Sequence, residues 1–191
     1  MYRTKINRVI QLLVLIALVT IALQPAQANT LDNSNGPVLP EQCSSIRVEE
    51  GHKLVFHTYA RGYQIYKWNA LTQKWDFVQP IAGLYAEEKY FGEVGIHYGG
   101  PTWESKSGSK VEARRVLDTG CAPDPNAIPW ILLFKHRTEG NGIFSSVTFI
   151  QRVNTTGGLA PTEPGLVDGE RKEIAYTAEY YFYKAENLNS N

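Results

Sequence analysis

The chain lacks the apolar periodicity of a helical domain and is instead divided into short β-type segments by turn-forming residues. Outside residues 9–23, no pattern with a 3.6-residue period persists for three turns. Residues 110–117 alternate, with Val111 and Ala113 on one face and Glu112 and Arg114 on the other, as in a half-buried strand. These patterns predict an all-β single domain, an antiparallel sandwich or barrel of roughly eight to ten strands with little helix.

Two turn signals predict hairpins, and the last apolar segment predicts a covered strand. Arg61-Gly62 separates "KLVFHTYA" from "YQIYKW", and residues 139–142, "EGNG", separate "IPWILLFKHR" from "IFSSVTFIQRV". Residues 173–185 place a series of apolar side chains on one face and further tyrosines on the other. We therefore expect both faces of this strand to be covered.

The N-terminal 28 residues have the layout of a secretory signal peptide. Three basic residues precede an apolar run at residues 9–23, and Ala26-Gln27-Ala28 follows it. The run is shorter than the roughly 20 residues of a spanning helix, so we expect cleavage after Ala28 rather than an uncleaved anchor. The predicted product is secreted or periplasmic, without stable membrane insertion, and consists of a flexible arm at residues 29–46 and one β domain at residues 47–187.

Charge and motifs exclude several classes of function. Cleavage would leave 16 basic against 19 acidic residues, a net charge of −3, so nucleic acid is not an expected partner. The chain has no G-x-S-x-G or H-E-x-x-H motif, no phosphate-binding glycine loop and no dinucleotide fingerprint. Its four histidines have no metal-ligand spacing. We therefore expect neither a cofactor nor a metal site.

The two cysteines, Cys43 and Cys121, are expected to form a disulfide, because an isolated pair in an oxidising compartment usually does. The bond would tie the N-terminal arm to the domain. The alternative is a pair of free thiols, because the sequence does not give the distance between the two residues.

Residues 95–105, "GIHYGGPTWES", are the densest group of candidate functional side chains. If residues 99–102 form a four-residue turn, Tyr98 faces Trp103 and His97 faces Glu104 across an antiparallel pair. An imidazole–carboxylate pair can hold the histidine protonated or orient it as a general base. The alternative is a surface ion pair at a strand end, with Tyr98 and Trp103 filling the core beneath it.

Two further segments contribute candidates. Asp124 lies in the proline-rich "CAPDPNAIPW" as a possible functional carboxylate, although an aspartate before proline more often starts a turn. "QRVNTTGGLAPTEPG" ends a strand with Arg152 and continues with Asn154 and Thr155 into a Gly-Gly loop. Asn154 also begins a glycosylation acceptor sequence.

Five segments, taken together and in order, resemble the secreted bacterial and fungal family known as domain-of-unknown-function family 3455. They are "GIHYGGPTWES", "KSGSKVEARRV", "APDPNAIPWILL", "VTFIQRVNTTGGLAP" and "YTAEYYFY", within residues 54–185. The resemblance implies no established activity. Members often carry cysteines where this chain has Trp68 and Leu166-Val167, which implies that Cys43–Cys121 replaces a lost disulfide.

Two functions from different classes are compatible with these observations. The first is a non-catalytic exported β domain that binds a small ligand, a glycan or a cell-envelope partner near residues 97–104 and 152–158, through residues that include Tyr98, Trp103, Asp124, Asn154 and Thr155. The second is a small hydrolase or lyase with His97 as base, Glu104 orienting it and Arg152 stabilising an anion. The second requires His97 and Arg152 to face one cavity.

Overall fold

The computed structural model describes residues 36–186, which form eight strands and one short 3-10 helix. The strands are β1 (His52–Asn69), β2 (Lys74–Tyr85), β3 (Glu93–Tyr98), β4 (Thr102–Ser105), β5 (Lys110–Arg115), β6 (Ile131–Glu139), β7 (Phe149–Gly157) and β8 (Arg171–Ala185). The helix, η1, spans Glu41–Ile46. The predicted signal peptide lies outside the described residues.

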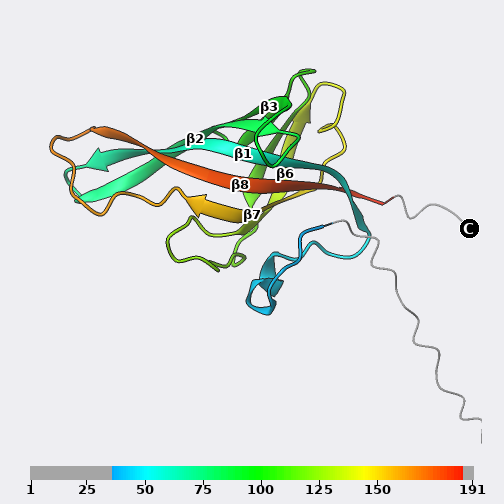
Figure 1. Cartoon of the computed structure of the whole chain (residues 1–191), viewed down its shortest axis with the longest axis horizontal. Coiled ribbons are helices and arrows are strands. Elements are labelled where there is room, and N and C mark those ends of the chain that lie inside the picture. Colours follow the sequence, from blue (N-terminus) through cyan, green and yellow to red (C-terminus); the bar gives the residue numbers. More distant parts are fainter. Residues whose placement is uncertain (1–35, 187–191) are drawn as a thin grey trace, which may run out of the picture. The chain divides into compact units, whose positions relative to one another are not determined.

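The eight strands form one closed, irregular barrel in which every strand is antiparallel to its neighbours (Figure 1). Each strand pairs with the next in sequence, and β8 closes the ring by pairing with β1. The all-β prediction is confirmed, and of its two forms the structure adopts the barrel. In Figure 1, β1, β2 and β8 also project beyond the other strands as a long twisted ribbon.

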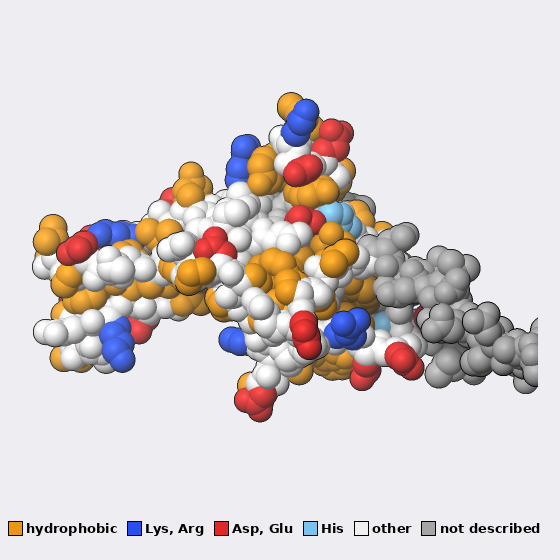
Figure 2. All heavy atoms as spheres, turned by 60° about the horizontal axis from the view of Figure 1, so that its bottom comes forward, with side chains coloured by type: hydrophobic (Ala, Val, Ile, Leu, Met, Phe, Trp, Pro, Cys, Tyr) orange, Lys and Arg blue, Asp and Glu red, His pale blue; other side chains and the backbone are white. Residues whose placement is uncertain are grey.

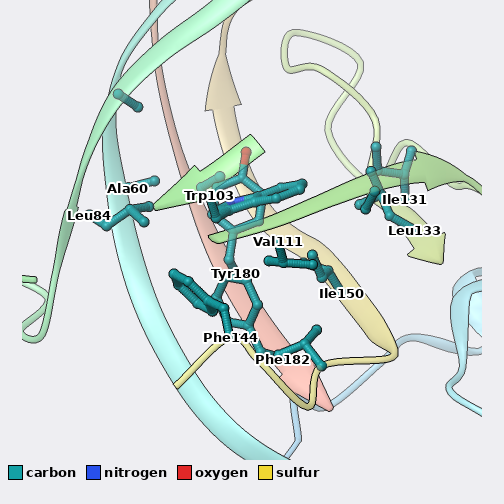
Figure 3. Close-up of a cluster of buried hydrophobic side chains, with 14 of the residues drawn as sticks. Ala60, Leu84, Trp103, Val111, Ile131, Leu133, Phe144, Ile150, Tyr180 and Phe182 are labelled. Atoms are coloured by element: carbon teal, nitrogen blue, oxygen red, sulfur yellow. The ribbon is translucent and has the colours of Figure 1, made fainter. Parts of the chain in front are cut away.

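The barrel interior is filled by side chains that alternate along each strand. On β8 the inward residues are Tyr176, Ala178, Tyr180 and Phe182, all at most 3% exposed, as the alternation predicts. Figure 3 shows this cluster gathering side chains from opposite parts of the ring, including Ala60 and Leu84 on one side and Ile131 and Leu133 on the other. On the outward face Tyr183 is buried and Tyr181 partly buried, so the expected cover on both faces is present around these tyrosines, whereas Arg171, Glu173 and Ala175 are exposed.

The outer face of β6, β7 and β8 is covered by the N-terminal segment. Cys43 and Ile46 of η1 are fully buried against Leu132 and Val153. The Gln151 side-chain amide donates to the Ile46 carbonyl at 2.7 Å. Cys43 and Cys121 form the predicted disulfide. Residues 36–46 therefore pack on the barrel, unlike the flexible arm that their polar sequence predicts, because the disulfide and Ile46 anchor them.

The predicted hairpin at Arg61-Gly62 is wrong, because β1 runs through these residues without a break. Gly62 pairs with Ala82 of β2 and with Tyr176 of β8, so both sides of the strand are occupied. The other predicted hairpin is confirmed, since residues 140–148 join the antiparallel neighbours β6 and β7. Gly62 marks a close approach between backbones rather than a turn.

Gly62→Ala is expected to lower the free energy of unfolding by about 2 kcal/mol through overpacking. A Cβ atom there would lie 2.1 Å from the Ile81 carbonyl oxygen and 2.7 Å from the Ala82 Cβ atom, and neither can move without bending β2. Gly83→Ala is the control, because its Cβ atom would meet only the end of the Tyr85 ring. Urea unfolding of both variants checks the prediction, and equal stabilities would contradict it.

No helix among the described residues is long and apolar enough to cross a membrane. Several apolar side chains lie exposed on the projecting ribbon of β1, β2 and β8 and on its loops, and Figure 2 shows hydrophobic atoms at this surface. They include Leu71, Phe77, Ile81, Leu166 and Val167.

Candidate functional site

The hairpin of β3 and β4 turns through three residues, Gly99, Gly100 and Pro101. Tyr98 therefore pairs with Thr102, and His97 pairs with Trp103. The predicted pairing of His97 with Glu104 is wrong, because it assumed a four-residue turn that included Thr102. A change of one residue in the turn moves each side chain of β4 to a different partner.

His97 and Trp103 point together into the barrel. Their rings stack at 4.3 Å with an angle of 14°, and the edge of Tyr180 meets His97 at 5.1 Å. The Nδ1–H group of His97 donates to the Thr102 carbonyl at 2.8 Å, which leaves Nε2 as an acceptor. Only 3% of His97 is exposed.

The pKa of His97 is lowered to about 3, so the imidazole is neutral near pH 7. Burial is the main cause, because it penalises the charged form. The hydrogen bond to Thr102 opposes the shift, and the positive charge of Arg152 adds to it. The protonated histidine that an ion pair with Glu104 would hold is therefore absent.

Glu104 lies on the outside of the barrel, in a different environment. Its Oε2 atom accepts from the Tyr98 hydroxyl at 2.9 Å and lies 3.3 Å from Lys110 Nζ. Beside these residues is a shallow depression of about 230 Å³ that also includes Glu112 and Arg137, which form an ion pair at 2.7 Å. The charges around Glu104 are thus already paired with one another.

A larger cavity of about 570 Å³ opens to solvent at one end of the ring, and its lining includes residues from all eight strands. It lies at the end of the barrel that carries the β3–β4 loop and the segment before β6. His97, Trp103 and Arg152 all line it. Its remaining walls are largely apolar and include Phe77, Pro80, Pro101, Ile128, Ile131 and Leu133.

Arg152 supplies a positive charge to this cavity. It lies on β7 between Ile131 of β6 and Tyr180 of β8. One of its Nη2–H groups donates to the Pro129 carbonyl at 2.8 Å, and its buried Nε atom has no hydrogen-bond partner. Among residues 36–186, no carboxylate lies within 4.0 Å of the guanidinium, which therefore lacks an ion-pair partner.

Other buried polar atoms near Arg152 also lack hydrogen-bond partners of ordinary geometry. They are Gln64 Nε2, Trp103 Nε1 and the hydroxyl oxygens of Tyr176 and Tyr180. Burial raises the pKa of Tyr180, while the charge of Arg152 and hydrogen-bonding contacts with Tyr176 and Arg152 lower it, so the three side chains are close neighbours. None of these contacts has the geometry of a well-formed hydrogen bond. Buried polar groups are usually paired, which makes such a concentration unusual.

The three other predicted binding residues lie outside the cavity. Asp124 is exposed, and its Oδ1 atom accepts from the Asn126 amide in a local turn. Asn154, which has a positive φ of 49°, points outward and donates to Glu179 Oε1 at 2.8 Å. The buried Thr155 hydroxyl donates to the Ile128 carbonyl. These three residues therefore have structural contacts and are separate from the group around Arg152.

Sequence reasoning missed Gln64 and Tyr180 as members of the site. Gln64 lies in the apolar segment "YQIYKW" at an inward position of β1, where a polar side chain is uncommon. This single polar residue in an apolar segment was the sequence signal that could have identified Gln64 as part of the site. Tyr180 gave no such sequence signal, because a buried tyrosine in a covered strand is expected.

Comparison with known proteins gave one family match. The family model described as "Protein of unknown function (DUF3455)" matches residues 49–184. No curated protein and no solved structure matches the chain. The matched range contains every residue that lines the cavity inside the barrel.

Proposed function

This chain belongs to the DUF3455 family of proteins of unknown function, and we propose that it is an exported, non-catalytic domain that binds a small organic ligand inside its barrel. The observation that carries the proposal is the cavity bounded by all eight strands. Its volume of about 570 Å³ falls within the range of roughly 300–1,000 Å³ that is usual for small-molecule sites. Apolar walls with a few polar groups are also typical of such sites.

The composition of the cavity favours binding over catalysis. Its lining includes no aspartate, glutamate, serine, threonine, cysteine or lysine. His97 and Arg152 do share the cavity, but Glu104 lies outside and cannot orient the imidazole. A general base works best with a pKa near the working pH, and a histidine with a pKa of about 3 is far from it. The alternative hydrolase or lyase thus lacks both a nucleophile and a suitable base.

Export is part of the proposal because of two independent features. Residues 1–28 have the order of charges, apolar residues and small residues that a signal peptide needs. The Cys43–Cys121 disulfide fits an oxidising compartment such as the periplasm or the extracellular space. We therefore place the ligand outside the cytoplasm and propose a small molecule in preference to a glycan or an envelope protein.

A thermal-shift screen of residues 29–191 against small organic acids, amides, alcohols and sugars tests the proposal. A ligand at 100 times its Kd stabilises the folded state by about 2.7 kcal/mol, which raises the Tm of a domain of this size by about 5 °C or more. Ile131→Trp is expected to abolish the shift, because the larger ring occupies the cavity.

Ile81→Trp is the matched control, since Ile81 lies on β2 and is 48% exposed outside the cavity. It should leave the shift unchanged. If no compound stabilises the wild type, or if Ile131→Trp leaves the shift intact, the ligand site is not the barrel cavity.

A further inference from the structure

Building on the proposed binding function, we infer that the ligand is a monocarboxylic acid whose carboxylate binds Arg152 and whose apolar body lies against the walls of the cavity. The inference goes beyond the presence of a pocket, because it assigns the charge and the orientation of the ligand. It rests on the arrangement of donors around Arg152.

The first step is the unpaired charge of Arg152. The Arg152 side chain donates one well-formed hydrogen bond, to the neutral Pro129 carbonyl, and its buried Nε–H group has no partner. Burying a cation without an anionic partner is unfavourable. A carboxylate supplies that partner and can accept two parallel hydrogen bonds from one guanidinium.

The second step is that most of the buried polar atoms without partners around the cavity are donors. The indole Nε1–H of Trp103 and the guanidinium of Arg152 are donors only, and the Gln64 amide nitrogen is a donor as well. These residues line the cavity together with Tyr180, whose hydroxyl also makes no hydrogen bond of ordinary geometry. Trp103 and Tyr180 are each 1% exposed, and Gln64 is 3% exposed. An acceptor-rich group such as a carboxylate, with two oxygens and about four lone-pair positions, complements this set.

The third step is the sign and size of the charge on the ligand. No acidic side chain lines the cavity, which disfavours a cationic ligand. The second cation in the lining, Arg115, is exposed and is bound to the Thr119 carbonyl through Nε and Nη2 at 3.1 and 2.6 Å. A single part-buried guanidinium matches one negative charge, whereas a phosphate dianion would bring in a second charge without a partner.

The remaining walls define the rest of the ligand. Ile128, Ile131 and Leu133 offer an aliphatic surface, and Pro80 and Pro101 add to it. His97 covers one face of Trp103 by stacking, so the walls rather than that face receive the apolar body. An aromatic or short aliphatic body suits these walls.

The experiment compares three acids with their own primary amides: 3-phenylpropanoate, indole-3-acetate and octanoate, measured at pH 7 by isothermal titration calorimetry. The amide keeps the body and removes the charge. We expect at least one acid to bind the wild-type protein about 30-fold more tightly than its amide, as for a charge-assisted buried pair. Arg152→Gln should reduce the affinity for that acid by about the same factor and leave the affinity for the amide within threefold.

Arg114→Gln is the matched control, because Arg114 is an exposed arginine of β5 outside the cavity, and it should change the affinity for the acid less than threefold. If acid and amide bind the wild type equally, the assignment of an anionic ligand is wrong while the binding function stands. If these compounds bind only as acids but Arg152→Gln binds them as tightly as the wild type, the anion site lies elsewhere. If none of the acids, amides, alcohols or sugars in the thermal-shift screen binds, the proposed function itself fails. Should Arg152→Gln not fold, the wild-type ratio of acid to amide decides alone.

Discussion

His97→Gln makes the protein less sensitive to acid, with the difference from wild type reaching about 4 kcal/mol in the free energy of unfolding near pH 3. The pKa of His97 falls from 6.5 in the unfolded chain to about 3 in the folded protein. Between these values the unfolded chain binds a proton that the folded protein does not. The stability of the wild type is therefore complete above about pH 6.5 and declines as the pH falls to 3, by about 1.4 kcal/mol per pKa unit.

Urea unfolding of both proteins from pH 7 to pH 3 measures this effect. Glutamine does not titrate, so the gap between the two curves isolates His97 from the carboxylates that both proteins share. His136→Gln is the control, because His136 is exposed and bonded only to Arg114. Parallel curves for wild type and His97→Gln would contradict the buried, neutral state of His97.

The double variant Cys43→Ala/Cys121→Ala loses about 4 kcal/mol of stability. The disulfide joins residues 78 positions apart, and its removal restores the entropy of that long loop to the unfolded chain. The folded state also changes, since Cys43 and Ile46 cover Leu132 and Val153 on the outer face of the barrel. We expect η1 to detach more readily and to expose that face.

Denaturant unfolding and hydrogen exchange test the two parts of this prediction separately. The amide of Cys43, which donates to the Pro40 carbonyl at 2.8 Å, should exchange faster in a protein reduced under native conditions. The amides of β8 should remain protected, because the ring closes without the disulfide. A loss of less than 1 kcal/mol in the double variant would show that Ile46 alone anchors the segment.

The parts of the fold that were predictable are those fixed by alternation over several residues. Residues 111–114 and 176–182 have a clear two-residue period, and the structure places Val111, Ala113, Tyr176, Ala178, Tyr180 and Phe182 inside the barrel. The turn residues at 139–142 correctly predicted a hairpin there, although the connection between β6 and β7 extends over residues 140–148. The hairpin prediction at Arg61-Gly62 was wrong because a glycine free to turn and a glycine at a close backbone approach look alike in sequence.

Three residues of the candidate site were predictable, but its geometry and its other members were not. His97, Trp103 and Arg152 are all recognisable as dense, chemically capable positions, yet the partner of His97 depended on whether the turn held three or four residues. Arg152 shares the inward face of β7 with Ile150, and the alternation allows this, although a charged residue is ordinarily expected outside. Only the closure of β8 on β1 brings Gln64 and Tyr180 to the same cavity.

The most direct test of the anion-binding cavity is a two-dimensional 1H–15N spectrum of the side-chain N–H groups, recorded as the best-binding acid of the series is added. The protein has four tryptophans, and Trp103→Phe assigns the Trp103 indole signal while Arg152→Lys assigns the Arg152 Nε–H signal. Trp75 serves as an internal reference, because its indole already donates to the Glu163 carbonyl at 2.9 Å. We predict that the Trp103 and Arg152 signals move together to saturation while the Trp75 signal stays in place. Unchanged Trp103 and Arg152 signals at saturating acid would contradict the account.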